Sequence, residues 1–154
     1  MWRLGFCLLL LAAGVAGADG GGGTEAAWCR GPLPDLFPGR PVWLGAPPPP
    51  SAGRLLPLRV TVRGGGVEAW VSLLDQLPNG ADRPAGSVMA GRGKTFLVSS
   101  RGRAILFVST RAGQFRFFRW PPGRTPAAVT VTLGPGGVRL SPPAPALPCR
   151  GTVS

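Results

Sequence analysis

Apolar and polar residues alternate over short stretches in the middle of the chain. Leu58, Val60 and Val62 are separated by polar residues, and residues 67–73 repeat the alternation after three glycines at 64–66. A period of two places one set of side chains on each face of an extended strand. The pattern therefore predicts two strands, each with one face in a core, joined by a glycine turn.

Six further stretches have the composition of strands, because β-branched and aromatic residues fill them and turn residues separate them. They comprise residues 86–89, 94–99, 104–110, 114–120, 128–133 and 138–141. Pro78-Asn79-Gly80 and Arg83-Pro84 predict a longer loop before the first of them. Residues 104–110 are apolar on both faces, which is typical of a central strand. The short turns around it predict that 94–99, 104–110 and 114–120 form a meander within one sheet.

No stretch after the N-terminus has the period of a sustained helix, and glycines recur too often for one. We therefore expect an all-β fold. The most natural form is a small antiparallel β-sandwich, or a partly open barrel, of about seven or eight short strands with Pro/Gly-rich irregular flanks.

Proline placement divides the chain. Nine prolines lie within 32–57 and eight within 121–148, with two between these ranges. The predicted units are a signal peptide (1–18), a Gly/Pro-rich segment (19–57), a β-sandwich body (58–141) and a Pro-rich tail (142–154). We expect the four prolines at 47–50 to be a stiff polyproline spacer, with a ligand for an aromatic groove as the alternative.

The N-terminus has the three parts of a secretory signal peptide. Arg3 precedes an apolar run at 4–13, and Ala16-Gly17-Ala18 follows as a small-x-small cleavage site. The run is shorter than the roughly 20 residues that span a membrane. We therefore expect cleavage after Ala18, no membrane span afterwards, and a secreted or periplasmic protein.

Cleavage would remove Cys7 and leave Cys29 and Cys149, near the two ends of the mature chain. Two cysteines in an exported protein pair readily, so we predict a disulfide that ties the N-terminal segment to the C-terminal tail. The alternative is a reactive thiol, favoured by Arg30 and Arg150, which follow the two cysteines and would lower a thiol pKa.

Charge indicates the class of partner. Lys and Arg total 17 against six Asp and Glu, a net charge of +11, and every basic residue except Lys94 is arginine. Such a surface attracts anions at long range, so an anionic glycan, lipopolysaccharide or an acidic protein is the expected partner. The alternative is that arginine is abundant only because the coding sequence is GC-rich. The oligomeric state is not readable from the sequence.

Two absences narrow the chemistry. The chain has no histidine and no tyrosine, so it cannot assemble a Ser-His-Asp or Cys-His arrangement or a histidine metal site. Asp75 and Asp82 flank the predicted loop and could meet across it, which is the one arrangement open to a carboxylate enzyme. A calcium site at Asp75, Asn79 and Asp82 would have too few carboxylates. We expect no catalysis, no metal and no cofactor.

The candidate binding residues lie at predicted turns and on one strand face. We expect the turns to gather basic side chains into a rim that binds the anionic partner, formed by Arg92, Lys94, Arg101, Arg103 and Arg111. Trp70 shares a strand face with Glu68 and Ser72 and could stack on a sugar ring, or pack against protein. Phe and Arg interleave at 115–119, as in single-strand nucleic-acid platforms, but core packing is the favoured interpretation and nucleic acid is not an expected partner. The alternative function is a structural or assembly protein that docks through edge strands or the proline-rich flank.

Overall fold

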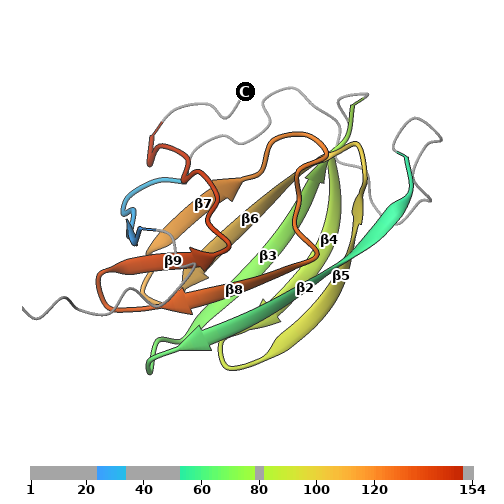
Figure 1. Cartoon of the computed structure of the whole chain (residues 1–154). Coiled ribbons are helices and arrows are strands. Elements are labelled where there is room, and N and C mark those ends of the chain that lie inside the picture. The colour runs from blue at the N-terminus through green and yellow to red at the C-terminus, as the bar shows by residue number, and fades with distance from the viewer. Residues whose placement is uncertain (1–23, 34–52, 79–81, 151–154) are drawn as a thin grey trace, which may run out of the picture.

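The computed structural model describes residues 24–33, 53–78 and 82–150. The predicted signal peptide, the prolines at 47–50 and Asn79 lie outside these residues. Within them the chain forms nine strands in two sheets that pack face to face and do not close into a barrel (Figure 1). The all-β sandwich is therefore confirmed. No helix in the described residues is long and apolar enough to cross a membrane.

Sheet A has five strands and sheet B has four. In spatial order, sheet A contains β1 (Ala26–Ala27), β9 (Gly137–Ser141), β8 (Ala128–Leu133), β2 (Leu55–Gly64) and β5 (Gly93–Ser99). Sheet B contains β4 (Asp82–Met89), β3 (Ala69–Gln76), β6 (Arg103–Thr110) and β7 (Phe115–Arg119). All neighbours are antiparallel except β2 and β8, which run parallel.

The core between the sheets is built from the alternation seen in the sequence. Val60 of β2 and Val71 of β3 are completely buried, as is Leu106 of β6. Their sequence neighbours point to the opposite faces. Apolar side chains on the inner faces of both sheets are removed from water, and this burial is the main contribution that holds the sheets together.

The predicted loop at Arg83-Pro84 is wrong, because both residues lie in β4. β4 is an edge strand, so the missing N–H of Pro84 removes no bond within the sheet. The pairing with β3 also shifts there, from Leu73–Gly86 to Leu74–Pro84, which leaves an extra residue in β4 as a β-bulge. The proline that suggests a loop in the sequence therefore lies in an edge strand, and together with the bulge it protects that edge from further pairing.

The predicted meander is also wrong. β5 pairs with β2 in sheet A, whereas β6 and β7 form a hairpin in sheet B. The turn between Ser99 and Arg103 carries the chain from one sheet to the other. Ser99 Oγ accepts hydrogen bonds from the backbone N–H groups of Arg101 and Gly102, at 3.3 and 3.1 Å. Alternation fixes which face of a strand is buried, but not which sheet the strand joins.

A second apolar cluster covers the outer face of sheet B. Cys29, Ile105, Phe115 and Phe117 are buried together. The ring of Phe117 stacks on that of Phe107 with centroids 4.5 Å apart. The aromatic residues of β7 are therefore core residues, as the favoured interpretation of the sequence held.

Segments near the two ends of the chain close one side of the sandwich, at the left of Figure 1. A disulfide joins Cys29 to Cys149, with an S–S length of 2.00 Å and Cα atoms 5.4 Å apart, which confirms the predicted pairing. Cys29 exchanges backbone hydrogen bonds of 2.8 and 3.1 Å with Phe115, and Leu147 donates one of 2.9 Å to Phe117. Both cystine segments thus pair with the free edge of β7. A disulfide of this kind fits an extracellular protein.

We predict that replacing both cysteines, as C29A/C149A, lowers the free energy of unfolding by about 2–5 kcal/mol, because the link restricts the unfolded chain and holds both segments against β7. Urea unfolding followed by tryptophan fluorescence measures the loss. An unchanged urea midpoint would show that backbone pairing alone holds the segments.

Candidate functional site

The structure divides the predicted basic rim between the two ends of the sandwich. Arg92 and Arg111 lie at the end where β2 leads into β3: the N–H of Arg111 donates to Glu68 O, and its Nη1 lies 3.3 Å from Glu68 Oε2. Arg101 lies in the β5–β6 turn and Arg103 begins β6, at the opposite end of β5 from Arg92. The five residues therefore do not form one continuous rim.

The end that carries Arg101 and Arg103 is crowded with positive charge. Burial, and then the nearby charge of Arg103, lower the pKa of the Arg119 guanidinium. Arg54 and Arg124 lie in neighbouring segments, since Ser100 N–H donates to Arg54 O and Gly123 N–H to Gly102 O.

Lys94 has a role within the fold. Its Nζ lies 5.3 Å from the centre of the Phe96 ring and donates a 3.3 Å hydrogen bond to Ser87 O. A cation over an aromatic ring is attracted to its electron-rich face. Lys94 therefore links β5 of sheet A to β4 of sheet B.

Trp70 points away from the core between the sheets, because Ala69 and Val71 on either side of it are buried within that core. It is half-buried, and its neighbours in register are Met89 on β4 and Ser109 on β6. Met89 is 46% exposed. Part of the indole thus remains open to solvent beside an exposed apolar side chain.

The outer face of sheet A carries a basic group that the sequence analysis did not select. Arg59 and Arg63 of β2 and Arg139 of β9 are exposed, while Val60 and Leu140 beside them are buried. Threonines occupy the neighbouring outward positions. We call this surface the arginine–threonine face, formed by Arg59, Thr61, Arg63, Thr95, Thr130, Thr132 and Arg139.

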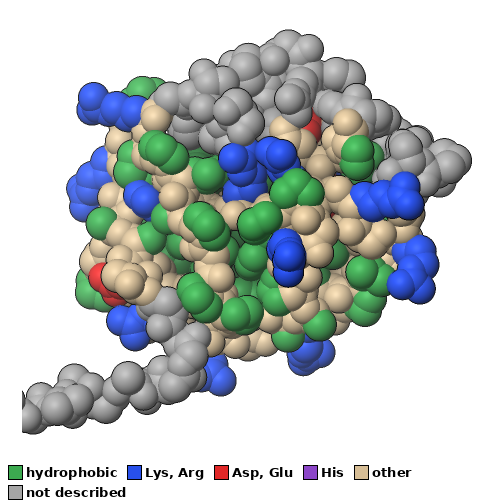
Figure 2. Space-filling model, turned by 45° about the horizontal axis from the view of Figure 1, so that its top comes forward, with side chains coloured by type: hydrophobic (Ala, Val, Ile, Leu, Met, Phe, Trp, Pro, Cys, Tyr) green, Lys and Arg blue, Asp and Glu red, His purple; other side chains and the backbone are tan. Residues whose placement is uncertain are grey.

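Strand register sets the spacing on the arginine–threonine face. Arg63 pairs with Thr132, which pairs with Arg139, so the three side chains form one row across three strands. Two strand spacings separate the outer two by about 10 Å, and four residues along β2 separate Arg59 from Arg63 by about 13 Å. Within the described residues, no carboxylate lies within ion-pair distance of these arginines, although Glu25 stands next to Arg139 across the β1–β9 pair. Over the whole surface seen in Figure 2, basic side chains greatly outnumber acidic ones.

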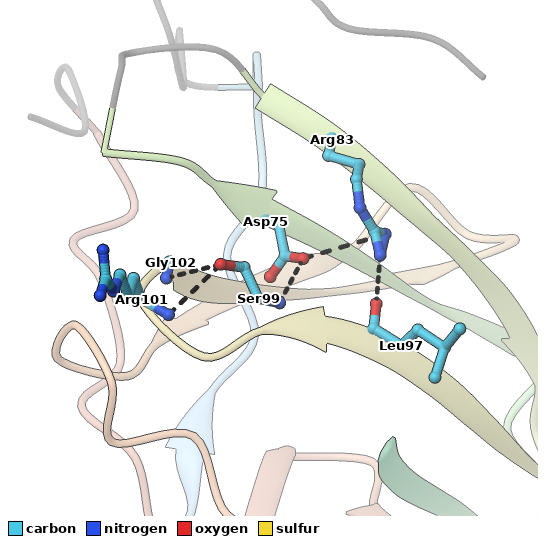
Figure 3. Close-up of polar contacts among 6 residues, drawn as sticks. All are labelled: Asp75, Arg83, Leu97, Ser99, Arg101 and Gly102. Carbon is cyan, nitrogen blue, oxygen red and sulfur yellow. Dashed lines mark hydrogen bonds and ion pairs between the residues drawn. The ribbon is translucent and has the colours of Figure 1, made fainter. Parts of the chain in front are cut away.

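A buried carboxylate links the two sheets on the side opposite the disulfide (Figure 3). Asp75 of β3 continues the inward stripe of Val71 and Leu73 and is fully buried. Its Oδ2 accepts a 2.9 Å hydrogen bond from Ser99 N–H and lies 3.9 Å from Arg83 Nη1. Arg83 of β4 also donates a 2.7 Å hydrogen bond to Leu97 O.

This ion pair occupies the free edge of β5. The N–H of Ser100 donates to Arg54 O, on the β2 side of the strand. Because backbone groups alternate sides along a strand, those of residues 97 and 99 point away from β2. Those groups are the Leu97 carbonyl bound by Arg83 and the Ser99 N–H bound by Asp75. The Arg83–Asp75 pair supplies the donor and acceptor that a further strand would supply, and so protects the edge from pairing.

Burial changes the protonation of Asp75. Desolvation raises the pKa of its carboxyl from 3.8 to about 6, and the Ser99 hydrogen bond and the Arg83 charge only partly oppose this. Oδ1 has no hydrogen-bond partner among the described residues. Asp82 is also fully buried, one register step away. Both carboxylates therefore face protein, and the described residues contain no cluster of three acids, histidines or cysteines that could hold a metal ion.

A guanidinium contacts the disulfide directly. Arg116 Nη1 lies 3.0 Å from Cys29 Sγ and 2.9 Å from Cys149 Sγ, and it donates a 3.2 Å hydrogen bond to Ala27 O. Burial lowers the pKa of this guanidinium. In the sequence, the basic residues next to the cysteines are Arg30 and Arg150 rather than Arg116. The contact with Arg116 depends on the β7 pairing and could not be read from local spacing.

The sequence contains the signal for the arginine–threonine face. Arg59, Thr61 and Arg63 are the polar positions of the alternation that predicts β2. Thr132 and Arg139 are likewise polar positions between apolar ones in β8 and β9. The polar half reads as solvated surface in each strand alone. Only the order β9–β8–β2 brings the three strands together.

No family model matches the chain, and a search of curated proteins finds no match to it.

The pKa of Asp75 predicts how stability depends on pH. A folded-state pKa of about 6, above 3.8 for the free carboxyl, means that the folded protein binds this proton more tightly than the unfolded chain does. The stability contributed by Asp75 is therefore present at low pH and falls as pH rises from about 4 to about 6, by on the order of 3 kcal/mol. We expect the difference in unfolding free energy between wild type and Asp75→Asn to fall by this amount across that range.

Urea titrations of both proteins at several pH values from 4 to 7 measure the difference, and subtracting the variant removes the contributions of the other acids. A difference that grows as pH rises would instead mean that Arg83 holds Asp75 ionised in the folded protein.

Proposed function

We propose that the protein is a non-catalytic binding module for an anionic glycan, which it binds through the arginine–threonine face. The observation that carries the proposal is the placement of Arg59, Arg63 and Arg139 on one face of three neighbouring strands, with no acidic partner among the described residues. Arginine presents several donors in a fork that matches sulfate, phosphate and carboxylate oxygens.

The spacing of the face favours an extended ligand. Separations of about 10 and 13 Å between the arginines are too large for one small ion and suit charges that recur along a polymer. The threonines between them add hydroxyl groups that can donate to or accept from sugar hydroxyls. The outer surface of the sheet also gives a chain a continuous path across neighbouring strands.

The rigid support of the face also favours binding. Val60, Val62 and Val131 lie directly beneath it in the core, and each is buried. The backbone positions of the arginines are thus fixed before any ligand arrives, which lowers the entropic cost of binding. Delivery out of the cell by the predicted signal peptide would bring the protein to compartments where anionic glycans are exposed.

The alternative, docking to another protein through edge strands, receives less support. The Arg83–Asp75 pair occupies the β5 edge, and the cystine segments occupy the β7 edge. β4 carries Pro84 and a bulge, both of which hinder pairing. The proline-rich flank at 47–50 lies outside the described residues.

We predict that replacing Arg59, Arg63 and Arg139 together by Gln weakens binding to heparin, used as the sulfated probe, by at least about tenfold, because three charge-assisted contacts are lost. Titration calorimetry at low and at physiological ionic strength measures the loss, and wild-type binding should weaken as salt increases.

The matched control removes the same charge elsewhere, with Arg101, Arg103 and Arg111 of the predicted rim replaced by Gln. We expect heparin affinity to stay within about twofold, since charges far from the contact are screened over roughly 8 Å. A loss in this control and not in the face variant would move the site to the predicted rim. Absence of heparin binding by wild type at low salt would refute the proposed function.

A further inference from the structure

We propose that the Cys29–Cys149 disulfide is a thiol-exchange site, at which a small amino-acid-type thiol attacks Cys149 and Arg116 stabilises the Cys29 thiolate that leaves. The inference does not depend on glycan binding. It rests on the contacts of Arg116, the unequal exposure of the two cysteines, and a hollow that reaches Arg116.

Arg116 contacts both sulfur atoms of the disulfide and has few other partners. A single guanidinium nitrogen, Nη1, lies within 3.0 Å of both sulfur atoms. No carboxylate among the described residues forms an ion pair with Arg116, and its Nε has no hydrogen-bond partner among them. A partly buried positive charge thus stands beside two neutral sulfurs.

Thiol exchange would give that charge a partner. A disulfide sulfur carries no net charge, whereas the departing thiolate carries a full negative one. An adjacent guanidinium lowers the pKa of a thiol, and a thiol of lower pKa leaves faster. Arg116 therefore stabilises the product of exchange more than the intact disulfide.

Exposure decides which sulfur is attacked. Cys29 is 2% exposed and lies in the apolar cluster with Phe115 and Phe117, while Cys149 is partly exposed. The attacking thiolate forms a new S–S bond with Cys149 Sγ and the Cys29–Cys149 bond breaks. The electron pair of that bond leaves on Cys29 Sγ, so one thiolate is consumed and one is formed, with no other oxidant or reductant.

A hollow of about 690 Å³ is lined by Arg116, whose Nη1 contacts both sulfur atoms, so a small thiol has room on the other side of this guanidinium. Its walls come from β1, β7 and the segment that includes Pro143 and Ala146. Its two charged lining residues are Arg116 and Glu25, one of each sign. That pair suits a ligand with one carboxylate and one ammonium group, which is why we assign an amino-acid-type thiol.

The test treats the full-length oxidised protein with cysteine, followed by acid quenching, alkylation of free thiols and peptide mass mapping. We expect the cysteine adduct on Cys149 and the alkyl group on Cys29. The rate constant should fall about fivefold to tenfold in Arg116→Gln, which removes the charge, and stay near wild type in Arg116→Lys, which keeps it. Arg124→Gln, an equal charge loss on an exposed loop, is the matched control and should leave the rate unchanged.

Two comparisons make the outcome decisive. Each rate is divided by the rate of the same thiol with a small model disulfide, which removes differences in intrinsic nucleophilicity. On this scale cysteine should react faster than mercaptoacetate or cysteamine, and equal ratios would overturn the amino-acid assignment. Urea unfolding of the oxidised variants identifies any that have lost the native fold. A native protein that forms no adduct, an adduct on Cys29, or an unchanged rate in folded Arg116→Gln would each overturn the exchange site.

Discussion

The structure depends on satisfying the backbone groups at the edges of two sheets that already share a core. Burial of alternate apolar residues holds sheet A against sheet B, but it does nothing for the N–H and C=O groups along the outermost strands. Each such group needs a partner or water, and a row of them invites pairing with another chain. The fold closes its two sides by different means. On one side the cystine segments pair with β7, and on the other the Arg83–Asp75 pair binds the Leu97 carbonyl and the Ser99 N–H of β5.

These two closures position two charged groups whose pKa values are shifted by burial. Asp75 is buried and Arg116 is partly buried at these closures, where each forms a hydrogen bond with a backbone group. Asp75 has a raised pKa because the closure buries it, and Arg116 has a lowered pKa for the same reason. The titrating carboxyl and the cystine contact are thus consequences of how a two-sheet fold closes its sides.

The sequence predicts the parts of the fold that depend on local alternation and on cysteine number. Strand β2, the all-β class and the Cys29–Cys149 pairing are all confirmed. It fails where long-range packing decides. The sequence around Pro84 predicts a loop, because only the sheet order shows that β4 is an edge strand. Residues 94–99 predict the start of a meander, because only the sheet order shows that they pair with β2. The sequence places Asp75 at the border of a loop. In the structure it follows Ala69, Val71 and Leu73 at every second position of β3, so its side chain points inward and is buried.

Strand order also explains why a strongly basic chain need not have one basic patch. Turn residues are distributed to both ends of a sandwich because successive turns alternate between ends, so arginines selected from turns are separated. Outward strand residues behave differently, since strands that neighbour each other in space collect their exposed side chains on one face whatever their separation in sequence. Arg63 and Arg139 are far apart in the chain but lie in the same row across the sheet, with Thr132 between them. For a fold of this class, charges that act together are better sought in the polar half of the strand alternation than at the turns, because register, unlike loop position, holds side chains at fixed spacing.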